Sequence, residues 1–325
     1  MTHLKFSQPP KTQIVGYFTL IYLLVVIAWG AYVRATGSGA GCGNHWPLCN
    51  GQVIPATQSF KTWVEFVHRV SSGLSLLLCL VLGFIAFKEF PKTSLTRKGA
   101  IASIFLILLE ALLGAGLVLL ELVADNQSVL RTVSMAVHLL NTFFLIGAVT
   151  LTTLWSSQEN QSELSIRPPF DPQYRGWAIA SLFTIFGLLW VGSSGAMTAL
   201  GDTLFPTFTL REGLAADLSP TSHFLVQLRL LHPIFAGLVT LGIILFSFSL
   251  KKQSQNPLVC FFVTILLGTQ TAELLLGVIN LLLLVPISTQ IAHLLLADLN
   301  WIFLILTLSS FWIIPFQARH ERVLN

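Results

Sequence analysis

Residues 66–87 read FVHRVSSGLSLLLCLVLGFIAF. From Val70 to Phe87 this stretch contains no charged residue, and a helix of roughly 20 apolar residues is what crosses a bilayer core of about 30 Å. His68 and Arg69 lie at its beginning. The stretch therefore predicts a membrane-crossing helix that carries an ionisable group near one end.

Comparable apolar runs recur along the whole chain. Charged residues make up 10% of the sequence, against about 25% in soluble domains, and the mean hydropathy is +0.77. Eight runs are long enough to cross a membrane, near residues 14–33, 66–87, 99–120, 132–155, 176–192, 224–250, 258–285 and 288–314. We expect an all-α integral membrane protein with eight transmembrane helices, surrounded by membrane lipid.

The distribution of Lys and Arg sets the expected orientation. An even number of crossings puts both termini on one side, and twelve of the 18 basic residues fall on that side, including Lys5, Arg319 and Arg322. The excess predicts cytoplasmic termini in a multi-pass protein of the cytoplasmic (inner) membrane. The first run is too long for a signal peptide and should remain as a helix. Because the basic residues are scattered over short loops, nucleic-acid binding is not expected.

The chain also repeats itself across a polar, proline-rich linker, residues 156–175. Five short matches occur in order, at offsets of 155 to 164 residues: His68–Gly73 with His232–Gly237, Glu110–Gly114 with Glu273–Gly277, His138-Leu-Leu with His293-Leu-Leu, Ser38–Ala40 with Ser194–Ala196, and Trp46-Pro47 with Phe205-Pro206. We predict two pseudo-symmetric four-helix bundles, residues 1–155 and 176–325, related by an axis along the membrane normal.

Four histidines fall near the external ends of the second, fourth, sixth and eighth helices: His68, His138, His232 and His293. Ionisable residues inside a membrane are functional candidates. A structural hydrogen bond would explain any one of them alone, but it explains two matched pairs poorly. Two histidines facing each other across a bundle are what axial ligation of a haem iron requires, so we predict one haem site in each half. A di-metal carboxylate site needs two Glu-x-x-His motifs, and only Glu65–His68 fits.

Arginines at the external helix ends are candidates for binding haem propionates. They are Arg34, Arg69, Arg131 and Arg229. Arginines whose side chains simply reach the membrane surface are the alternative interpretation.

The two halves differ three residues before their first histidine, where Glu65 in one half corresponds to Arg229 in the other. A separation of three places each residue on the helix face of its histidine. A carboxylate beside a haem edge can transfer a proton or stabilise a developing cation, so we predict catalysis by Glu65 in the N-terminal half. A salt bridge to Arg69 is the alternative. Glu110 and Glu273, at equivalent mid-helix positions, are expected to be structural.

Two cysteines, Cys42 and Cys49, lie in the external loop after the first helix. An external loop is in an oxidising compartment, so a disulfide is the first expectation. A metal site that includes His45 and a redox-active dithiol are the alternatives.

These residues resemble the signature of the haem A synthase family: Gly30-x-x-Val33-Arg34-x-Thr36-Gly37-Ser38-Gly39, Trp46-Pro47-x-Cys49-x-Gly51 and Glu65-x-x-His68-Arg69. The similarity continues through His138, His232-Pro233 and His293, and so covers nearly the whole chain. The resemblance implies oxidation of a ring methyl of the substrate haem O, through a hydroxymethyl intermediate, to the formyl group of haem A.

The resemblance also implies different functions for the two halves. The substrate haem would bind at His68 and His138, with Glu65 near the reacting group, and a haem b cofactor would bind at His232 and His293. One departure is that some members carry a second external cysteine pair, whereas residues 198–221 contain no cysteine here.

Two other functions compete with this prediction. A di-haem b-type electron carrier would need only the four histidines, but it leaves Glu65 and the cysteine loop unexplained. A transporter would have broken helices at mid-depth, whereas the polar residues here concentrate at the external end. Pathway logic alone suggests a haem O synthase and cytochrome oxidase assembly factors as partners, and a homo-oligomer is left open.

Overall fold

The computed structural model describes residues 8–56, 59–160 and 163–315. Lys5, Arg319 and Arg322, which contributed to the predicted orientation, lie outside the described residues.

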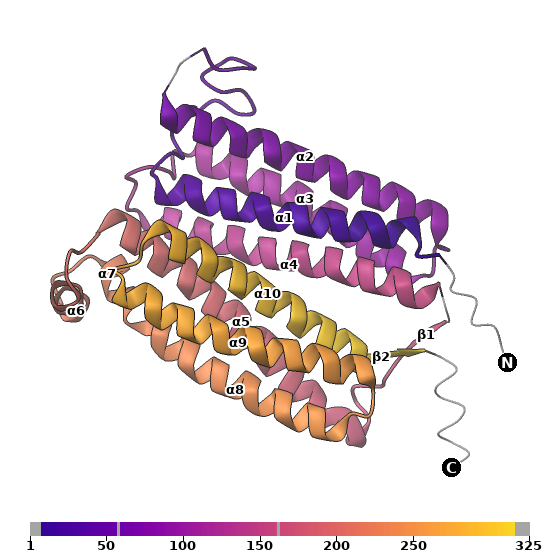
Figure 1. Cartoon of the computed structure of the whole chain (residues 1–325). Coiled ribbons are helices and arrows are strands. Elements are labelled where there is room, and N and C mark those ends of the chain that lie inside the picture. Colours follow the sequence, from indigo (N-terminus) through magenta and orange to yellow (C-terminus); the bar gives the residue numbers. More distant parts are fainter. Residues whose placement is uncertain (1–7, 57–58, 161–162, 316–325) are drawn as a thin grey trace, which may run out of the picture.

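The described residues form long helices connected by short loops (Figure 1). The first half contains α1 (Lys11–Ala35), α2 (Phe60–Glu89), α3 (Leu95–Leu119) and α4 (Val129–Glu159). The second half contains α5 (Pro172–Leu204), the short α6 (Leu210–Leu218) and α7 (Phe224–Arg229), then α8 (Leu231–Gln253), α9 (Pro257–Leu282) and α10 (Ile287–Trp312). With α7 and α8 counted as one span, eight segments are long and apolar enough to cross a membrane. The predicted all-α integral membrane protein is confirmed.

Polar residues at the loop ends fix where several helices begin. The side chains of Ser94 and Ser128 accept hydrogen bonds from backbone N–H groups in the first turns of α3 and α4, and Asp171 and Asn256 do the same for α5 and α9. These caps satisfy backbone donors that have no partner within the helix. The sequence thus places helix starts at the polar ends of the apolar runs.

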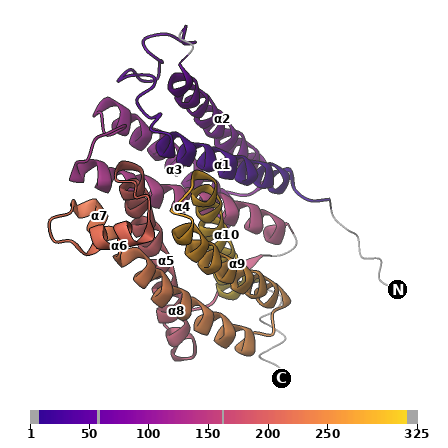
Figure 2. The same ribbon diagram turned by 60° about the vertical axis from the view of Figure 1, so that its left-hand side comes forward.

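The two halves form two four-helix bundles packed side by side (Figures 1 and 2). The interface consists mainly of α4 against α5 and α10, with α1 against α10. In its centre Trp301 donates a hydrogen bond of 2.6 Å from Nε1 to the carbonyl oxygen of Phe143, and the two rings stack with centroids 5.6 Å apart. A Cβ at Gly192 would lie 2.2 Å from Cε2 of Phe143, so α5 and α4 approach this closely only because residue 192 is glycine.

The two ends of the paired bundles differ. α1 begins and α10 ends at one end, which we call the terminal end; the loops after α1, α3, α5 and α9 lie at the other, which we call the histidine end (Figure 1). At the terminal end β1 (Leu164–Ile166) pairs antiparallel with β2 (Ile313–Pro315). The pairing joins the linker between the halves to the end of α10, and the sequence did not predict it.

The largest error in a predicted helix boundary is at the end of the fifth run, and a repeat match fails with it. The fifth run was expected to end near residue 192, but α5 continues to Leu204. The hydroxyls of Ser193 and Ser194 donate to the carbonyl oxygens of Leu189 and Val191, so these polar residues are satisfied inside the helix. Ser194–Ala196 therefore lies within α5, whereas Ser38–Ala40 follows α1, and the two segments are not equivalent.

Candidate functional site

The four histidines all lie at the histidine end, on α2, α4, α8 and α10. His68 and His138 lie on α2 and α4 of the first half, and His232 and His293 lie on α8 and α10 of the second. Each half therefore carries one of the predicted pairs at its histidine end, and the pairing around a haem stays a prediction.

A glycine on the neighbouring helix lies against each imidazole ring. A Cβ built on the glycine would approach Cε1 of the ring to 3.0 Å for Gly30 and His68, 3.1 Å for Gly195 and His232, 3.2 Å for Gly277 and His293, and 3.9 Å for Gly114 and His138. At the three closer positions a larger residue would displace the ring. These contacts give the true register of the repeat, in which Gly30 on α1 corresponds to Gly195 on α5.

The Nδ1 atoms of the four rings have different surroundings. Oε1 of Glu110 lies 3.3 Å from Nδ1 of His138, and Oε1 of Glu273 lies 3.3 Å from Nδ1 of His293. Nδ1 of His232 is 3.0 Å from Oγ of Ser194. Nδ1 of His68 is buried and, like Nδ1 of His138 and His293, makes no hydrogen bond among the described residues.

These donor atoms fit a haem better than a bare metal ion. Among residues 8–56, 59–160 and 163–315 there is no cluster of three or more His, Cys, Asp or Glu that could hold a metal. A structural zinc site needs four such ligands, whereas a haem iron needs only its two axial positions filled. In three of the four rings the neighbouring polar atom described above lies beside Nδ1, which is compatible with Nε2 binding iron.

Glu65 is buried, with 3% of its surface exposed, and both of its carboxylate oxygens are engaged. The backbone N–H of Cys42 donates to Oε2 at 2.7 Å, and Nε and Nη2 of Arg69 donate to Oε1 at 3.1 and 2.5 Å. The salt bridge weighed as an alternative is thus present. It does not exclude a chemical role, because it fixes the carboxylate one helical turn before His68.

The loop after α1 covers Glu65. Cys42 and Cys49 form the predicted disulfide, so in this structure their sulfurs are not thiolates that could bind a metal with His45. Thr62 of α2 donates to the carbonyl oxygen of Gly41 at 2.7 Å. A Cβ at Gly41 would lie 2.3 Å from the carbonyl oxygen of Lys61, so glycine lets the loop press directly against the start of α2.

The arginines predicted to bind propionates already have protein partners. Nη1 of Arg69 donates to the carbonyl oxygens of His45 and Leu48, in addition to the bonds to Glu65. Nη1 of Arg131 donates to the carbonyl oxygens of Ala124 and Asn126. Both arginines therefore hold loops in place, and their binding of propionates stays a prediction.

The other two arginines form longer connections. Arg229 pairs with Asp202 at 3.2 Å and with Asp217 at 2.8 Å. Arg34 reaches from α1 into the second half, where it donates to the carbonyl oxygen of Ala199, Oγ1 of Thr203 and Oε1 of Gln290. In the register set by Gly30 and Gly195, Ala199 is the counterpart of Arg34, so the side chain bonds the backbone of its own equivalent position.

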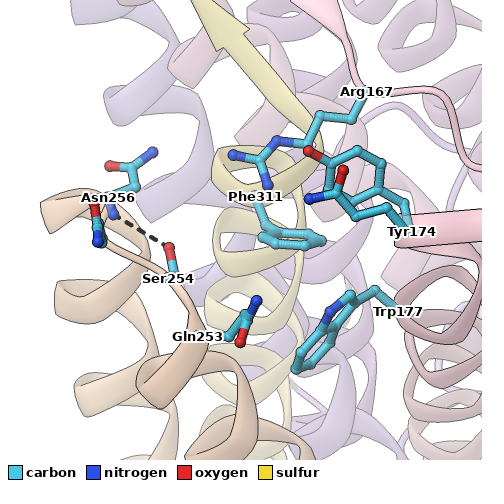
Figure 3. Close-up of a pocket in the computed structure, with 9 residues that line it drawn as sticks. Arg167, Tyr174, Trp177, Gln253, Ser254, Asn256 and Phe311 are labelled. Atoms are coloured by element: carbon cyan, nitrogen blue, oxygen red, sulfur yellow. Dashed lines mark hydrogen bonds between the residues drawn. The ribbon is translucent and has the colours of Figure 1, made fainter. Parts of the chain in front are cut away.

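The structure contains two notable cavities, one between the halves and one at the terminal end. An apolar groove of about 620 Å³ lies between the halves and is lined by α1, α2 and α10, with Trp29, Val64 and Leu295 in its walls. A smaller pocket of about 230 Å³ contains Arg167, Tyr174, Trp177 and Phe311 (Figure 3). Phe311 is eighteen residues after His293 on α10, about 27 Å along the helix, so this second pocket is remote from the histidines.

Comparisons with known proteins agree with the resemblance. Residues 13–305 match the COX15-CtaA family, described as cytochrome oxidase assembly protein. A Thermus thermophilus protein named protoheme IX farnesyltransferase is 42% identical over 284 residues, which are 86% of this chain and 45% of that protein.

Proteins named heme A synthase are also similar. The one from Shouchella clausii is 34% identical over 164 residues, which are 50% of this chain and 52% of the relative. The one from Halalkalibacterium halodurans is 30% identical over 197 residues, which are 58% and 62% of the two chains. The chain thus spans about half the length of the curated relatives that it matches.

Proposed function

Since the chain belongs to the COX15-CtaA family, we propose that it is a haem A synthase, an oxidoreductase that converts a ring methyl of haem O to the formyl group of haem A through a hydroxymethyl intermediate. The relatives named heme A synthase support this activity. The observation that carries the proposal is that two similar histidine pairs occur, but only the first has a fully buried, fixed glutamate, Glu65, one helical turn before its first histidine.

Each half would bind a different haem. His68 and His138 would hold the substrate haem O, and His232 and His293 would hold haem b as a cofactor. The difference at one position supports this division, because Glu65 in the first half is replaced by Arg229 in the second. Arg229 is paired with two aspartates, which suits a site that retains its haem and performs no chemistry on it.

Bound haem would supply the iron and the redox chemistry of the reaction. Within the protein, Cys42 N–H and Arg69 hold the Glu65 carboxylate in one position. A fixed, buried carboxylate can accept a proton from the reacting group or stabilise positive charge that develops on it. The disulfide-closed loop shields this carboxylate from water, which strengthens its electrostatic effect.

The same proposal includes a location and partners. The excess of Lys and Arg with the termini, and a disulfide at the histidine end, support an inner-membrane protein whose termini are cytoplasmic and whose histidine end faces outward. The Thermus relative, named for haem farnesylation, contains a region similar to this chain within a longer polypeptide. That arrangement supports a haem O synthase as a partner, in addition to cytochrome oxidase assembly factors.

Co-expression with a haem O synthase in a host that lacks haem A tests the activity. We expect haem A or its hydroxymethyl precursor among the extracted haems, separated by chromatography and identified by mass. If folded protein with a reductant yields only haem b and unconverted haem O, the chain is better described as a di-haem electron carrier.

A further inference from the structure

A partly buried glutamate faces one histidine in each half. Glu110 of α3 faces His138 of α4, and Glu273 of α9 faces His293 of α10, with the same Nδ1–Oε1 distance of 3.3 Å. The other glutamate of the candidate site, Glu65, contacts Arg69 and Cys42 instead. The Glu–His contact is therefore a repeated feature of the second histidine of each pair.

The helix that carries the glutamate contacts the same ring a second time. Gly114 follows Glu110 by four residues and lies against Cε1 of His138; Gly277 follows Glu273 by four residues and lies against Cε1 of His293. Residues four apart are neighbours on one helix face. Each imidazole thus has a carboxylate oxygen 3.3 Å from Nδ1 and, beside Cε1, a glycine from the next turn of the same helix.

The remaining partners of the two glutamates differ between the halves. Asn141 and Thr142 each donate to Glu110 at 2.5 Å. Oε2 of Glu273 is buried and has no hydrogen-bond partner among the described residues. If the two glutamates served only to accept hydrogen bonds from neighbouring polar groups, Glu273, which lacks such donors, would not be expected to lie in the same place relative to its histidine as Glu110. What the two share is the histidine.

We propose that Glu110 and Glu273 are positioning residues, each of which accepts a hydrogen bond from Nδ1–H of one haem ligand and thereby directs Nε2 of that ligand to the iron. The inference rests on the proposed function, because it takes His138 and His293 as ligands. Neither Nδ1 makes a hydrogen bond within the described part of the chain, so the proposed bond requires the ring to rotate toward the carboxylate when Nε2 binds iron. Carboxylates that orient metal-bound histidines also make the imidazole a stronger donor.

The second half offers the sharper test, because Glu273 lacks the additional donors that hold Glu110. Glu273→Leu removes the acceptor, Glu273→Gln keeps an acceptor oxygen without the charge, and Gln270→Leu is the matched control. Gln270 is a buried polar residue on the same helix, and it bonds Thr240 and not a histidine. The full-length protein with bound haem b is used for all of them.

We expect Glu273→Leu to weaken haem retention about 10-fold, measured by transfer to apomyoglobin, and to shift the haem midpoint potential in the positive direction. Glu273→Gln should retain haem and show a smaller positive shift, since a weaker acceptor makes His293 a weaker donor to ferric iron. Gln270→Leu should leave both quantities unchanged.

Unchanged retention and potential in Glu273→Leu would overturn this inference and leave the proposed function intact. Equal shifts in Gln270→Leu would also overturn it, because the effect would then be one of packing. If Glu273→Leu does not fold, the midpoint potential of Glu273→Gln is the test. An unchanged potential in that variant would overturn the inference. Wild-type protein that binds no haem would overturn the proposed function and this inference together.

Discussion

The two halves have similar arrangements around their histidines, and their main difference lies one helical turn before the first histidine. In both, a glycine lies against the first histidine, and a glutamate and a second glycine lie against the other. One turn before the first histidine, however, the first half has Glu65 and the second has Arg229. The comparison teaches that the parts expected to hold a haem are the same in both halves, whereas the part expected to act on it is present in one.

A second difference concerns how firmly the first histidine is held. Nδ1 of His232 is bonded to Ser194, but Nδ1 of His68 has no partner among the described residues. A substrate haem must enter and leave, whereas a cofactor haem should stay. An unanchored ligand in the first half and an anchored one in the second would suit these two needs.

The largest effect should come from removing a ligand. We expect His293→Ala to abolish the haem b spectrum of the purified protein, because one axial position of its iron is lost. His138→Ala should leave that spectrum in place, since it alters the other half. Loss of haem b in both variants would show that the two sites are not separate.

An intermediate effect should follow from adding one methyl group beside a histidine. Gly30→Ala and Gly195→Ala place a Cβ 3.0 and 3.1 Å from Cε1 of His68 and His232, at a cost of about 1–3 kcal/mol if the ring must move. We expect Gly195→Ala to lower haem b occupancy and Gly30→Ala to lower haem O binding in a titration. If Gly195→Ala instead lowered haem O binding and Gly30→Ala lowered haem b occupancy, the proposed roles of the two halves would be reversed.

A smaller effect should come from Ser194→Ala, which removes the hydroxyl bonded to His232. One hydrogen bond contributes about 1 kcal/mol, so haem b should dissociate roughly 5-fold faster in a stopped-flow transfer experiment. An unchanged rate would mean that Ser194 does not anchor the ligand, and the proposed contrast with His68 would disappear.

Much of this architecture could be predicted from the sequence, because lipid imposes a simple rule. Every span needs about 20 apolar residues, and all eight runs became helices. The disulfide followed from two cysteines in one external loop, and the Glu65–Arg69 pair followed from their i, i+4 spacing. These features depend on residues close together in the chain.

What could not be predicted depends on contacts between distant segments. The partners of Arg34 lie 165 or more residues away, and nothing in its own helix indicates them. The spacing of Glu110 and Gly114 was visible as a repeat, but not that both face His138. The extension of α5 was missed because Ser193 and Ser194 lower the hydropathy although their hydroxyls bond within the helix.

The central claim, that only the first half performs chemistry, is tested most directly by comparing Glu65→Gln with Arg229→Gln. In both variants we would measure haem A formed per folded, haem b-containing molecule during co-expression with a haem O synthase. We expect Glu65→Gln to lower this yield about 100-fold or more with haem b retained. Arg229→Gln should destabilise the protein by about 1–3 kcal/mol, because it leaves two partly buried aspartates without their cation, while the surviving molecules remain active. Normal product formation by Glu65→Gln would contradict the account.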